Sequence, residues 1–476
     1  MNKNLIAGNW CEGRSVRENI NPSDLSDIVG IYAQADAEDT QRAIEAATRA
    51  QPIWAAYSSQ QRADALDRIG TEILQRQTEL GELLAREEGK VLPEAIAEVS
   101  RAGHIFKFFA GEAMRVTGEH LDSVRSGIEV DILRQPVGVV GIITPWNFPI
   151  AIPAWKIAPA LAYGNSVVFK PADLVPGSAW ALADIIHRSS LPDGTFNLLM
   201  GRGSVVGQTM LESPKVRAIS FTGSADTGQR IMQSAGTRMA KLQMEMGGKN
   251  PLVVLNDAEL DRAVECAVHG AFFSTGQRCT ASSRFIVEKG IYPHFVQAVV
   301  TRLEQLRVGH ALEAGIDIGP VADASQYEQD LNYVDIGKAE GAFLASGGVP
   351  LKRETEGFYM SPALFTDCDP HMRIAQEEIF GPVACVIPAD NYEQALEFAN
   401  ATPFGLSAGI CTTSLKHATH YKRHVQSGMV MVNTPTAGVD YHVPFGGTKA
   451  SSFGPREQGH HAIEFFTTTK TAYTQA

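Results

Sequence analysis

The stretch Val137-Gly138-Val139-Val140-Gly141-Ile142-Ile143 decides the fold class of this chain. It is apolar at almost every position, and short runs of the same kind follow at 166–169, 218–221 and 252–255, with helical patterns between them. Strands that are apolar on both faces and alternate with helices are typical of a parallel sheet covered by helices. The sequence therefore predicts an α/β fold.

A second series of apolar runs indicates a second α/β domain. These runs lie at 284–287, 383–387 and 429–432, and helical segments at 292–306 and 392–399 separate them. A helical region at 40–111 precedes the first series. We place the junction of the two domains between residues 248 and 260.

Two segments fit neither domain and are expected to form an arm. Residues 128–133 alternate apolar and polar side chains, and residues 465–473 are rich in strand formers. Strands of this kind can pair with each other and leave an edge for another subunit, which predicts a homodimer or a homotetramer. The predicted division is 1–115 with 135–248 as the first domain, 249–448 as the second, and 116–134 with 449–476 as arm and tail.

Composition excludes several classes of function. The 476 residues carry a formal net charge of −12, which argues against broad nucleic-acid binding. The sequence contains no run of roughly 18 apolar residues and no signal peptide, so we expect a soluble, cytoplasmic protein without membrane attachment. Its six cysteines form no Cys-x-x-Cys pair and its histidines no His-Glu-x-x-His pattern, so no metal site is predicted.

Cys279 is the candidate nucleophile. It follows Gly276-Gln277-Arg278 and precedes small hydroxyl residues, a setting that can lower a thiol pKa and admit a small electrophile. A buried apolar cysteine is the alternative interpretation. Partners elsewhere in the chain decide between the two.

Asn147 and Lys170 follow two of the predicted strands. Asn147 lies in Pro145-Trp146-Asn147-Phe148-Pro149, at the strand end where open α/β sheets bind ligands, and its amide could donate to an oxyanion. Lys170 could hydrogen-bond a nucleotide ribose or phosphate. Taken alone, each residue could equally belong to a turn or to the solvated end of a strand.

Two glycine-containing loops and two glutamates complete the pattern. The segment 221–228 joins a strand to a helix and could bring backbone N–H groups and the Ser224 hydroxyl to a phosphate, while 201–207 resembles a dinucleotide fingerprint with one residue too many. Glu245, between two methionines, has the surroundings of a general base. Glu378 is a second candidate carboxylate, and a surface position is the alternative for both.

Together these segments resemble the aldehyde dehydrogenase superfamily over essentially the whole chain. Motifs at 144–149, 170–172, 221–228, 245–250 and 276–279 occur in the order of that family, followed by those at 378–382 and 444–447. The resemblance implies two tandem Rossmann-like α/β domains with a small β arm for oligomerisation. It also implies oxidation of an aldehyde by NAD or NADP through a cysteine thioester that water hydrolyses.

The resemblance assigns a role to each motif residue. The catalytic set would be Cys279, Glu245, Asn147 and Lys170. Residues expected to bind the cofactor are Thr144, Pro145, Trp146, Lys170, Ala172, Asp173, Gly203, Gly207, Phe221, Gly223, Ser224, Thr227, Gly247, Glu378 and Phe380. Asp173 stands where the family often uses Glu to favour NAD, so NAD is favoured and NADP stays open.

The expected substrate is a small aldehyde that carries a carboxylate. The resemblance places Ile152, Trp155, Arg278, Thr280, Val439 and Phe445 along the substrate tunnel. Arg278 could pair with a carboxylate, and the segments 433–444 and 455–459 look most like family members that oxidise 2-oxoglutarate semialdehyde (2,5-dioxopentanoate) in bacterial sugar-acid catabolism. Succinate semialdehyde, another short ω-oxo acid or an aliphatic aldehyde is the alternative, and a catalytically silent binding protein is the alternative from another class.

Overall fold

The computed structural model describes residues 1–475, so the last residue of the predicted tail, 476, lies outside the described part. Its centre is an eight-stranded sheet in the order β2-β1-β9-β8-β7-β10-β11-β21. The strands from β9 to β11 are parallel, and both edges are antiparallel. The bounds are β1 (Asn4–Ile6), β2 (Asn9–Cys11), β7 (Val139–Ile143), β8 (Ser166–Lys170), β9 (Phe196–Leu198), β10 (Val216–Thr222), β11 (Lys241–Glu245) and β21 (Ser452–Phe453).

The second sheet has seven strands in the order β14-β15-β16-β13-β12-β18-β19, all parallel except β14. Two tandem α/β sheets are therefore present, which confirms the predicted fold class. The strands of the second sheet are β12 (Pro251–Val254), β13 (Arg284–Glu288), β14 (Phe343–Ser346), β15 (Ala363–Thr366), β16 (Val383–Ala389), β18 (Ser407–Cys411) and β19 (Met429–Val432). The short strands β17 (Phe404–Gly405) and β20 (Thr448–Lys449) pair beside it.

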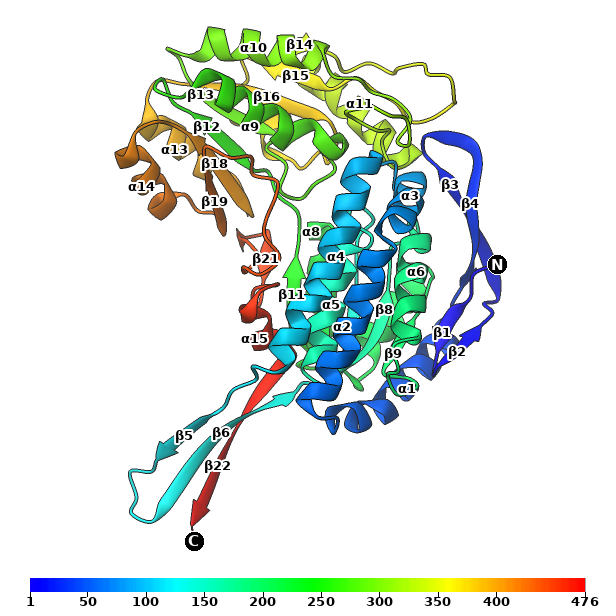
Figure 1. Cartoon of the computed structure of the whole chain (residues 1–476). Helices are drawn as coiled ribbons and strands as arrows, with labels where there is room; N and C mark the ends of the chain where they lie inside the picture. The colour runs from blue at the N-terminus through cyan, green and yellow to red at the C-terminus, as the bar shows by residue number, and fades with distance from the viewer. Residues whose placement is uncertain (476) are drawn as a thin grey trace.

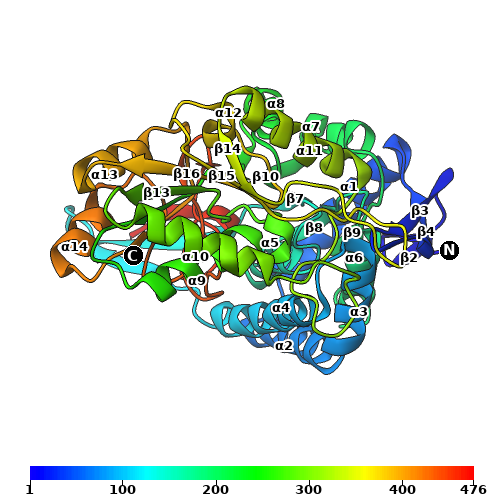
Figure 2. The same ribbon diagram turned by 90° about the horizontal axis from the view of Figure 1, so that it is seen from above.

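Helices cover both sheets (Figure 1). Seen from above, α2 and α4 lie on one side of the first sheet and α7 and α8 on the other (Figure 2). Helix α5, whose residues are all buried, packs beneath β7 and β8. The helices are α1 (Ala37–Ala55), α2 (Ser59–Gln75), α3 (Gln77–Glu88), α4 (Leu92–Ala113), α5 (Ala151–Ala162), α6 (Pro176–His187), α7 (Gln208–Glu212), α8 (Ala225–Gly236), α9 (Leu260–Phe272), α10 (Tyr292–Glu304), α11 (Ala324–Ala339), α12 (Arg373–Gln376), α13 (Tyr392–Asn400), α14 (Leu415–His424) and α15 (Ile463–Phe466).

A three-stranded arm projects from the body of the molecule, with the C-terminal end near its tip (Figure 1). It consists of β5 (Glu119–Asp122), β6 (Ile128–Pro136) and β22 (Thr467–Gln475). The two segments predicted to pair do so, in antiparallel register from Thr467 opposite Pro136 to Gln475 opposite Ile128. Leu133 and Tyr473 are exposed on this arm.

An N-terminal hairpin was not predicted. Strands β3 (Ser15–Asn21) and β4 (Asp24–Gln34) form a ribbon whose turn reaches the second sheet's domain (Figure 1). There, Phe358 N–H donates to the Pro22 carbonyl and Leu25 N–H to the Glu356 carbonyl. These partners are more than 300 residues away in sequence, so no local pattern signals the contact.

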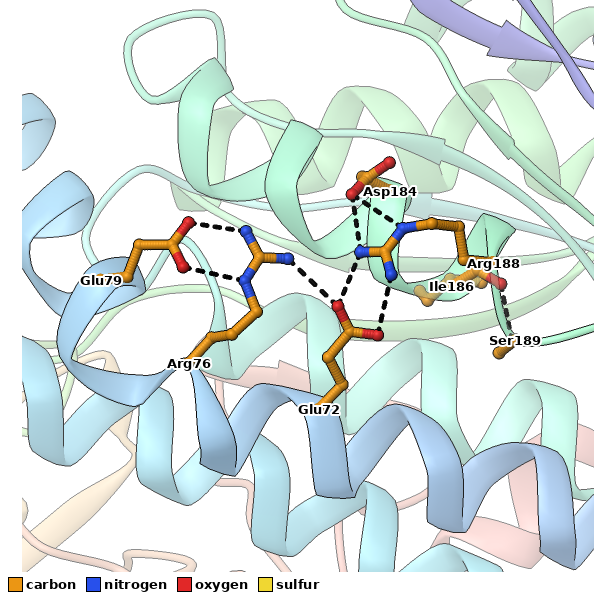
Figure 3. A network of polar contacts seen from close by, with 7 residues as sticks. All are labelled: Glu72, Arg76, Glu79, Asp184, Ile186, Arg188 and Ser189. Carbon is orange, nitrogen blue, oxygen red and sulfur yellow. Dashed lines mark hydrogen bonds and ion pairs between the residues drawn. The ribbon is translucent and has the colours of Figure 1, made fainter.

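Helices α2 and α6 are joined by the ionic network in Figure 3. Glu72 of α2 accepts from Arg76 at 3.2 Å and from Arg188, after α6, at 2.6 Å, and each arginine also contacts a second acid, Glu79 or Asp184. The side chains are partly exposed, so each pair contributes at most about 1 kcal/mol. The network orients the helices beneath the sheet more than it stabilises them.

Two negative findings concern residues 1–475. No helix in that range is long and apolar enough to cross a membrane. The same residues contain no group of three or more His, Cys, Asp or Glu side chains placed to hold a metal ion.

Candidate active site

One cavity of about 1340 Å³ lies at the carboxyl ends of β7, β8, β10 and β11. Ligands of open α/β sheets bind at this edge. The cavity runs from the first turn of α8 to Cys279, and it brings together motif residues that are more than 100 positions apart in the sequence. Of the predicted residues, its lining includes Thr144, Pro145, Trp146, Asn147, Ile152, Trp155, Lys170, Ala172, Gly203, Gly207, Phe221, Gly223, Ser224, Thr227, Glu245, Gly247, Cys279, Glu378, Phe380 and Phe445.

The N-terminus of α8 forms one end of the cavity. Ser224 caps the helix, since its hydroxyl accepts from the Thr227 N–H at 3.4 Å. A Cβ on Gly228 would overlap the Met246 sulfur, so glycine lets this turn lie close to the strand-end segment. Backbone N–H groups and the helix dipole at such a turn favour an anion. The predicted run at 201–207 instead forms a wide π-helical turn over Gly203–Gly207 that leads into α7.

Lys170 and Glu378 lie on the walls between this end and Cys279. Lys170 donates to the Pro171 carbonyl at 2.7 Å, and burial lowers the pKa of its ammonium group. Glu378 accepts from the Gly248 N–H at 2.7 Å, and burial raises the pKa of its carboxyl to about 7. Gly247 has a φ of 67°, and a Cβ there would overlap the Glu378 carboxylate, so the glycine lets backbone and carboxylate meet.

Asn147 is held in a rigid loop after β7. Its Nδ2 donates to the Gln277 carbonyl at 2.9 Å, and its own carbonyl accepts from Lys90 at 2.7 Å. Lys90 is paired with Glu98 at 2.6 Å, and Glu98 also accepts from the N–H groups of Ile150 and Ala151 at the start of α5. A buried ionic pair therefore fixes the loop that carries the Asn147 amide.

Cys279 lies half-buried in the wall of the cavity. Three consecutive residues, Ser274, Thr275 and Gly276, have positive φ, so the chain turns sharply before the cysteine. The Cys279 carbonyl accepts from Asn250 at 2.8 Å. Burial, followed by the negative charges of Glu378 and Glu245, raises the pKa of the thiol to about 12. This direction is opposite to the one expected from the loop sequence, because burial and the two acids outweigh the hydrogen bond from the Cys279 N–H.

Glu245 is the last residue of β11 and is 3% exposed. It accepts a hydrogen bond from the Ser452 hydroxyl at 2.6 Å, across the pairing of β11 with β21. Burial and the neighbouring Glu457 raise the pKa of its carboxyl well above the ordinary value. A carboxylate whose pKa is raised in this way is a stronger base than an ordinary glutamate.

Arg278 does not face the cavity. Its guanidinium donates to Glu94 at 2.6 Å and to the Ser274 hydroxyl at 2.9 Å, and its side chain is only 10% exposed. The guanidinium is thus already paired with a carboxylate from the start of α4. The structure therefore differs from the prediction that Arg278 contacts a substrate carboxylate, because the guanidinium is bound to Glu94 instead.

Three more predicted residues lie outside the cavity lining in the described part of the chain. Asp173 has one carboxylate oxygen 3.7 Å from Arg17 of β3, and its other oxygen is buried without a hydrogen-bond partner in the range 1–475. Thr280 is buried, with its carbonyl accepting from Thr436 at 2.7 Å. Val439, like Cys279, packs against a small buried cluster that includes Phe445.

Comparison with known proteins identifies the family. The model of the aldehyde dehydrogenase family matches residues 10–472. The chain belongs to the aldehyde dehydrogenase family. This confirms the family resemblance and the predicted class of aldehyde-oxidising enzyme.

Relatives within the family have names that agree on one substrate. An alpha-ketoglutaric semialdehyde dehydrogenase of Bacillus subtilis is 43% identical, with 99% of this chain and 98% of the relative covered. An alpha-ketoglutarate semialdehyde dehydrogenase of Haloferax volcanii is 41% identical over the same shares. A 2,5-dioxopentanoate dehydrogenase of Saccharolobus solfataricus is 38% identical over 98% of both chains.

Solved structures of the family share the fold. A betaine aldehyde dehydrogenase from Staphylococcus aureus, solved in complex with NAD+, superposes with a TM-score of 0.97 and 34% identity, covering 100% of this chain and 94% of that chain. A second crystal structure of that enzyme with NAD+ gives the same TM-score over 95% of its chain.

Some lining residues of this family member were not found from the sequence. The α8 end also includes Ser204, Gln208 and Arg230, and the opposite wall includes Gln326 and Tyr333. Arg230 follows Thr227 by three positions on α8, so the helical period could have placed it on the same face as that predicted residue. Gln326 and Tyr333 lie on α11 of the other domain, and no local pattern signals their position.

Proposed function

We propose that this protein oxidises 2-oxoglutarate semialdehyde (2,5-dioxopentanoate) to 2-oxoglutarate, with NAD or NADP as hydride acceptor and water as acyl acceptor. The observation that carries the proposal is the meeting of Cys279, Asn147 and Glu245 in one cavity, with Lys170 and Glu378 toward its α8 end. The names of three full-length relatives support the substrate.

The cavity fits a dinucleotide. The α8 N-terminus, with Ser224 and Thr227, would hold the pyrophosphate, and Lys170 and Glu378 would bind ribose hydroxyls. The unpartnered buried oxygen of Asp173 is an acceptor available to the adenosine ribose, even though Asp173 lies just outside the lining. When bound, the nicotinamide would supply the acceptor for the hydride that leaves the substrate carbon.

Asp173 also favours NAD over NADP. Its negative charge would repel a 2′-phosphate, while Arg17 at 3.7 Å offsets part of that repulsion. The NAD+ complexes of the staphylococcal relative are in keeping with this choice.

Cys279 would form the first covalent bond. Its sulfur adds to the aldehyde carbon as the thiol proton passes to solvent water, and the Asn147 amide donates to the oxygen that becomes negative. Loss of hydride from the resulting thiohemiacetal leaves a thioester on Cys279. Burial raises the pKa of the Cys279 thiol, so we expect the attack on the aldehyde to become faster as pH rises.

Glu245 would release the product. Its carboxylate takes a proton from water, the hydroxide adds to the thioester carbon, and the carbon–sulfur bond breaks to give the carboxylate and free Cys279. The Ser452 hydroxyl at 2.6 Å orients the glutamate for this step. A base at this position supports hydrolysis rather than transfer of the acyl group to another thiol.

We further propose the division into 1–115 with 135–248 for the cofactor, 249–448 for catalysis, and the arm and tail for assembly into a homodimer or homotetramer. The exposed apolar side chains of Leu133 and Tyr473 on the arm support the assembly role.

A substrate panel tests the proposed function. We expect kcat/KM to be highest for 2-oxoglutarate semialdehyde with NAD, lower for succinate semialdehyde, and lowest for pentanal. Equal or better turnover of pentanal would contradict the carboxylate substrate, and activity only with coenzyme A would contradict hydrolysis.

A further inference from the structure

Arg101 of α4 is a cation without an acidic partner. No carboxylate in the range 1–475 forms an ion pair with it, and its Nη2 donates to the side-chain oxygen of Gln458 at 3.0 Å. Its Nε is buried and has no hydrogen-bond partner among these residues. Arg101 as a whole is half-buried, and a buried Nε–H without an acceptor is unfavourable unless a ligand supplies one.

Gln458 presents a second unused donor at the same place. It is fully buried, with a φ of 59°, and its side-chain oxygen is occupied by Arg101. Its Nε2 has no partner anywhere in the described chain. Two adjacent side chains therefore hold buried N–H groups that lack an acceptor, and a carboxylate is the group that accepts from both.

Arg101 and Gln458 do not belong to the cavity lining, and the pair lies behind Trp155 at the aldehyde end of the cavity. The Arg101 guanidinium is 5.7 Å from the centroid of the Trp155 ring, and Trp155 lines the cavity together with Cys279. The Trp155 ring packs 5.4 Å from Phe445, another lining residue. Helix α4 lies against α5, which carries Trp155 (Figure 1).

The acids near Arg101 are occupied or exposed. Glu98 is paired with Lys90, and Glu457 is bound by Trp155 Nε1 at 2.7 Å and by Lys156. Asp440 lies on the exposed loop beside Tyr441, whose ring stacks on His104 of α4. Burial lowers the pKa of the Arg101 guanidinium, and negative charge at Glu98, Asp440 and Cys279 acts in the opposite direction. The last of these places Arg101 within electrostatic range of the nucleophile.

We propose that Arg101 and Gln458 bind the carboxylate of the ω-oxo acid while its aldehyde carbon faces Cys279. The inference rests on the proposed function. It assigns binding of the substrate carboxylate to Arg101 on α4 instead of to Arg278. The carboxylate accepts from the Arg101 fork and the Gln458 amide, and Trp155 and Phe445 contact the carbon chain between the two ends.

The test compares one charged and one neutral aldehyde in matched variants. For Arg101→Gln we expect kcat/KM for 2-oxoglutarate semialdehyde to fall roughly a hundredfold, mainly through KM, and kcat/KM for pentanal to change less than threefold. Arg101→Lys keeps the positive charge but loses the paired N–H donors of the guanidinium. It should therefore keep more activity on the oxo acid than Arg101→Gln does. Lys107→Gln removes a cation from the exposed side of the same helix and is the control.

A second variant covers the case in which Arg101→Gln fails to fold. Gln458→Glu supplies Arg101 with a permanent carboxylate, which keeps the charge balanced and occupies the proposed site. It should show the same selective loss on the oxo acid, and glutarate should inhibit pentanal oxidation in the wild type but not in this variant.

Equal losses on both aldehydes in Arg101→Gln and Gln458→Glu would overturn the proposal, since they would show a structural role. A wild-type enzyme that prefers the oxo acid and keeps that preference in both variants would overturn the Arg101 site alone. A wild-type enzyme without any preference would overturn the proposed substrate as well.

Discussion

The two ends of the cavity differ in how they are built. At the α8 end, motif residues from contiguous strand-to-helix segments line the wall, and backbone N–H groups, Ser224 and Lys170 lie within a few residues of their strands. At the Cys279 end, the walls combine α5, β11 and the loop before β20, and Arg278 turns away from the cavity to meet Glu94. Local segments of the sequence therefore form the cofactor end, whereas packing between distant segments determines which side chains face the aldehyde.

The largest expected effect comes from the aldehyde end. Cys279→Ala should lower kcat by at least about 10⁴-fold because no thioester can form, while binding of NAD, followed by its quenching of tryptophan fluorescence, stays within twofold. Cys11→Ala, on an edge strand, is the control for loss of a thiol. Weakened NAD binding in Cys279→Ala would show that the two ends are not independent.

Glu245→Gln should slow turnover by about 10²- to 10⁴-fold and keep a pre-steady-state burst of NADH. The pKa of Glu245 is raised in the folded protein, so its carboxylate form is lost as pH falls through that raised pKa. Wild-type turnover should accordingly fall with decreasing pH in a range above the ordinary value of 4.5, and the variant should lack this limb. Loss of the burst would show that Glu245 also acts before the thioester forms.

The sequence predicts the cofactor end of the cavity better than the aldehyde end. The strand runs and the α8 loop were located from their local sequence, and Asn147 and Glu245 were located from the short motifs that contain them. Arg278 was misplaced because its partner, Glu94, is 184 positions distant. Arg101 carried no local signal either, since its unused N–H appears only once α4 packs beside Trp155.

Arg278→Gln should therefore affect folding and not selectivity. Removing the guanidinium leaves Glu94 partly buried without its cation, at a cost of about 2 kcal/mol in the free energy of unfolding. Urea denaturation should show the loss, and kcat/KM for the oxo acid and for pentanal should change by the same factor. A loss of kcat/KM for the oxo acid alone would show that Arg278 contacts the substrate.

The smallest expected effect is at the α8 end. Arg17→Ala removes the positive charge 3.7 Å from Asp173, so repulsion of a 2′-phosphate should lower kcat/KM for NADP by about threefold and leave NAD within experimental error. Arg14→Ala, on the segment before β3, is the matched control. An equal loss with both cofactors would mean that Arg17 supports the hairpin and not the choice of cofactor.

The proposed reaction requires that Cys279 carries the acyl group and that Glu245 removes it. The most direct measurement is the intact mass of Glu245→Gln quenched with acid after mixing with NAD and 2-oxoglutarate semialdehyde. We expect one 2-oxoglutaryl group per chain, on the peptide that contains Cys279, and none in Glu245→Gln/Cys279→Ala. An unmodified Cys279 during the NADH burst, or an acyl group on another residue, would contradict this mechanism.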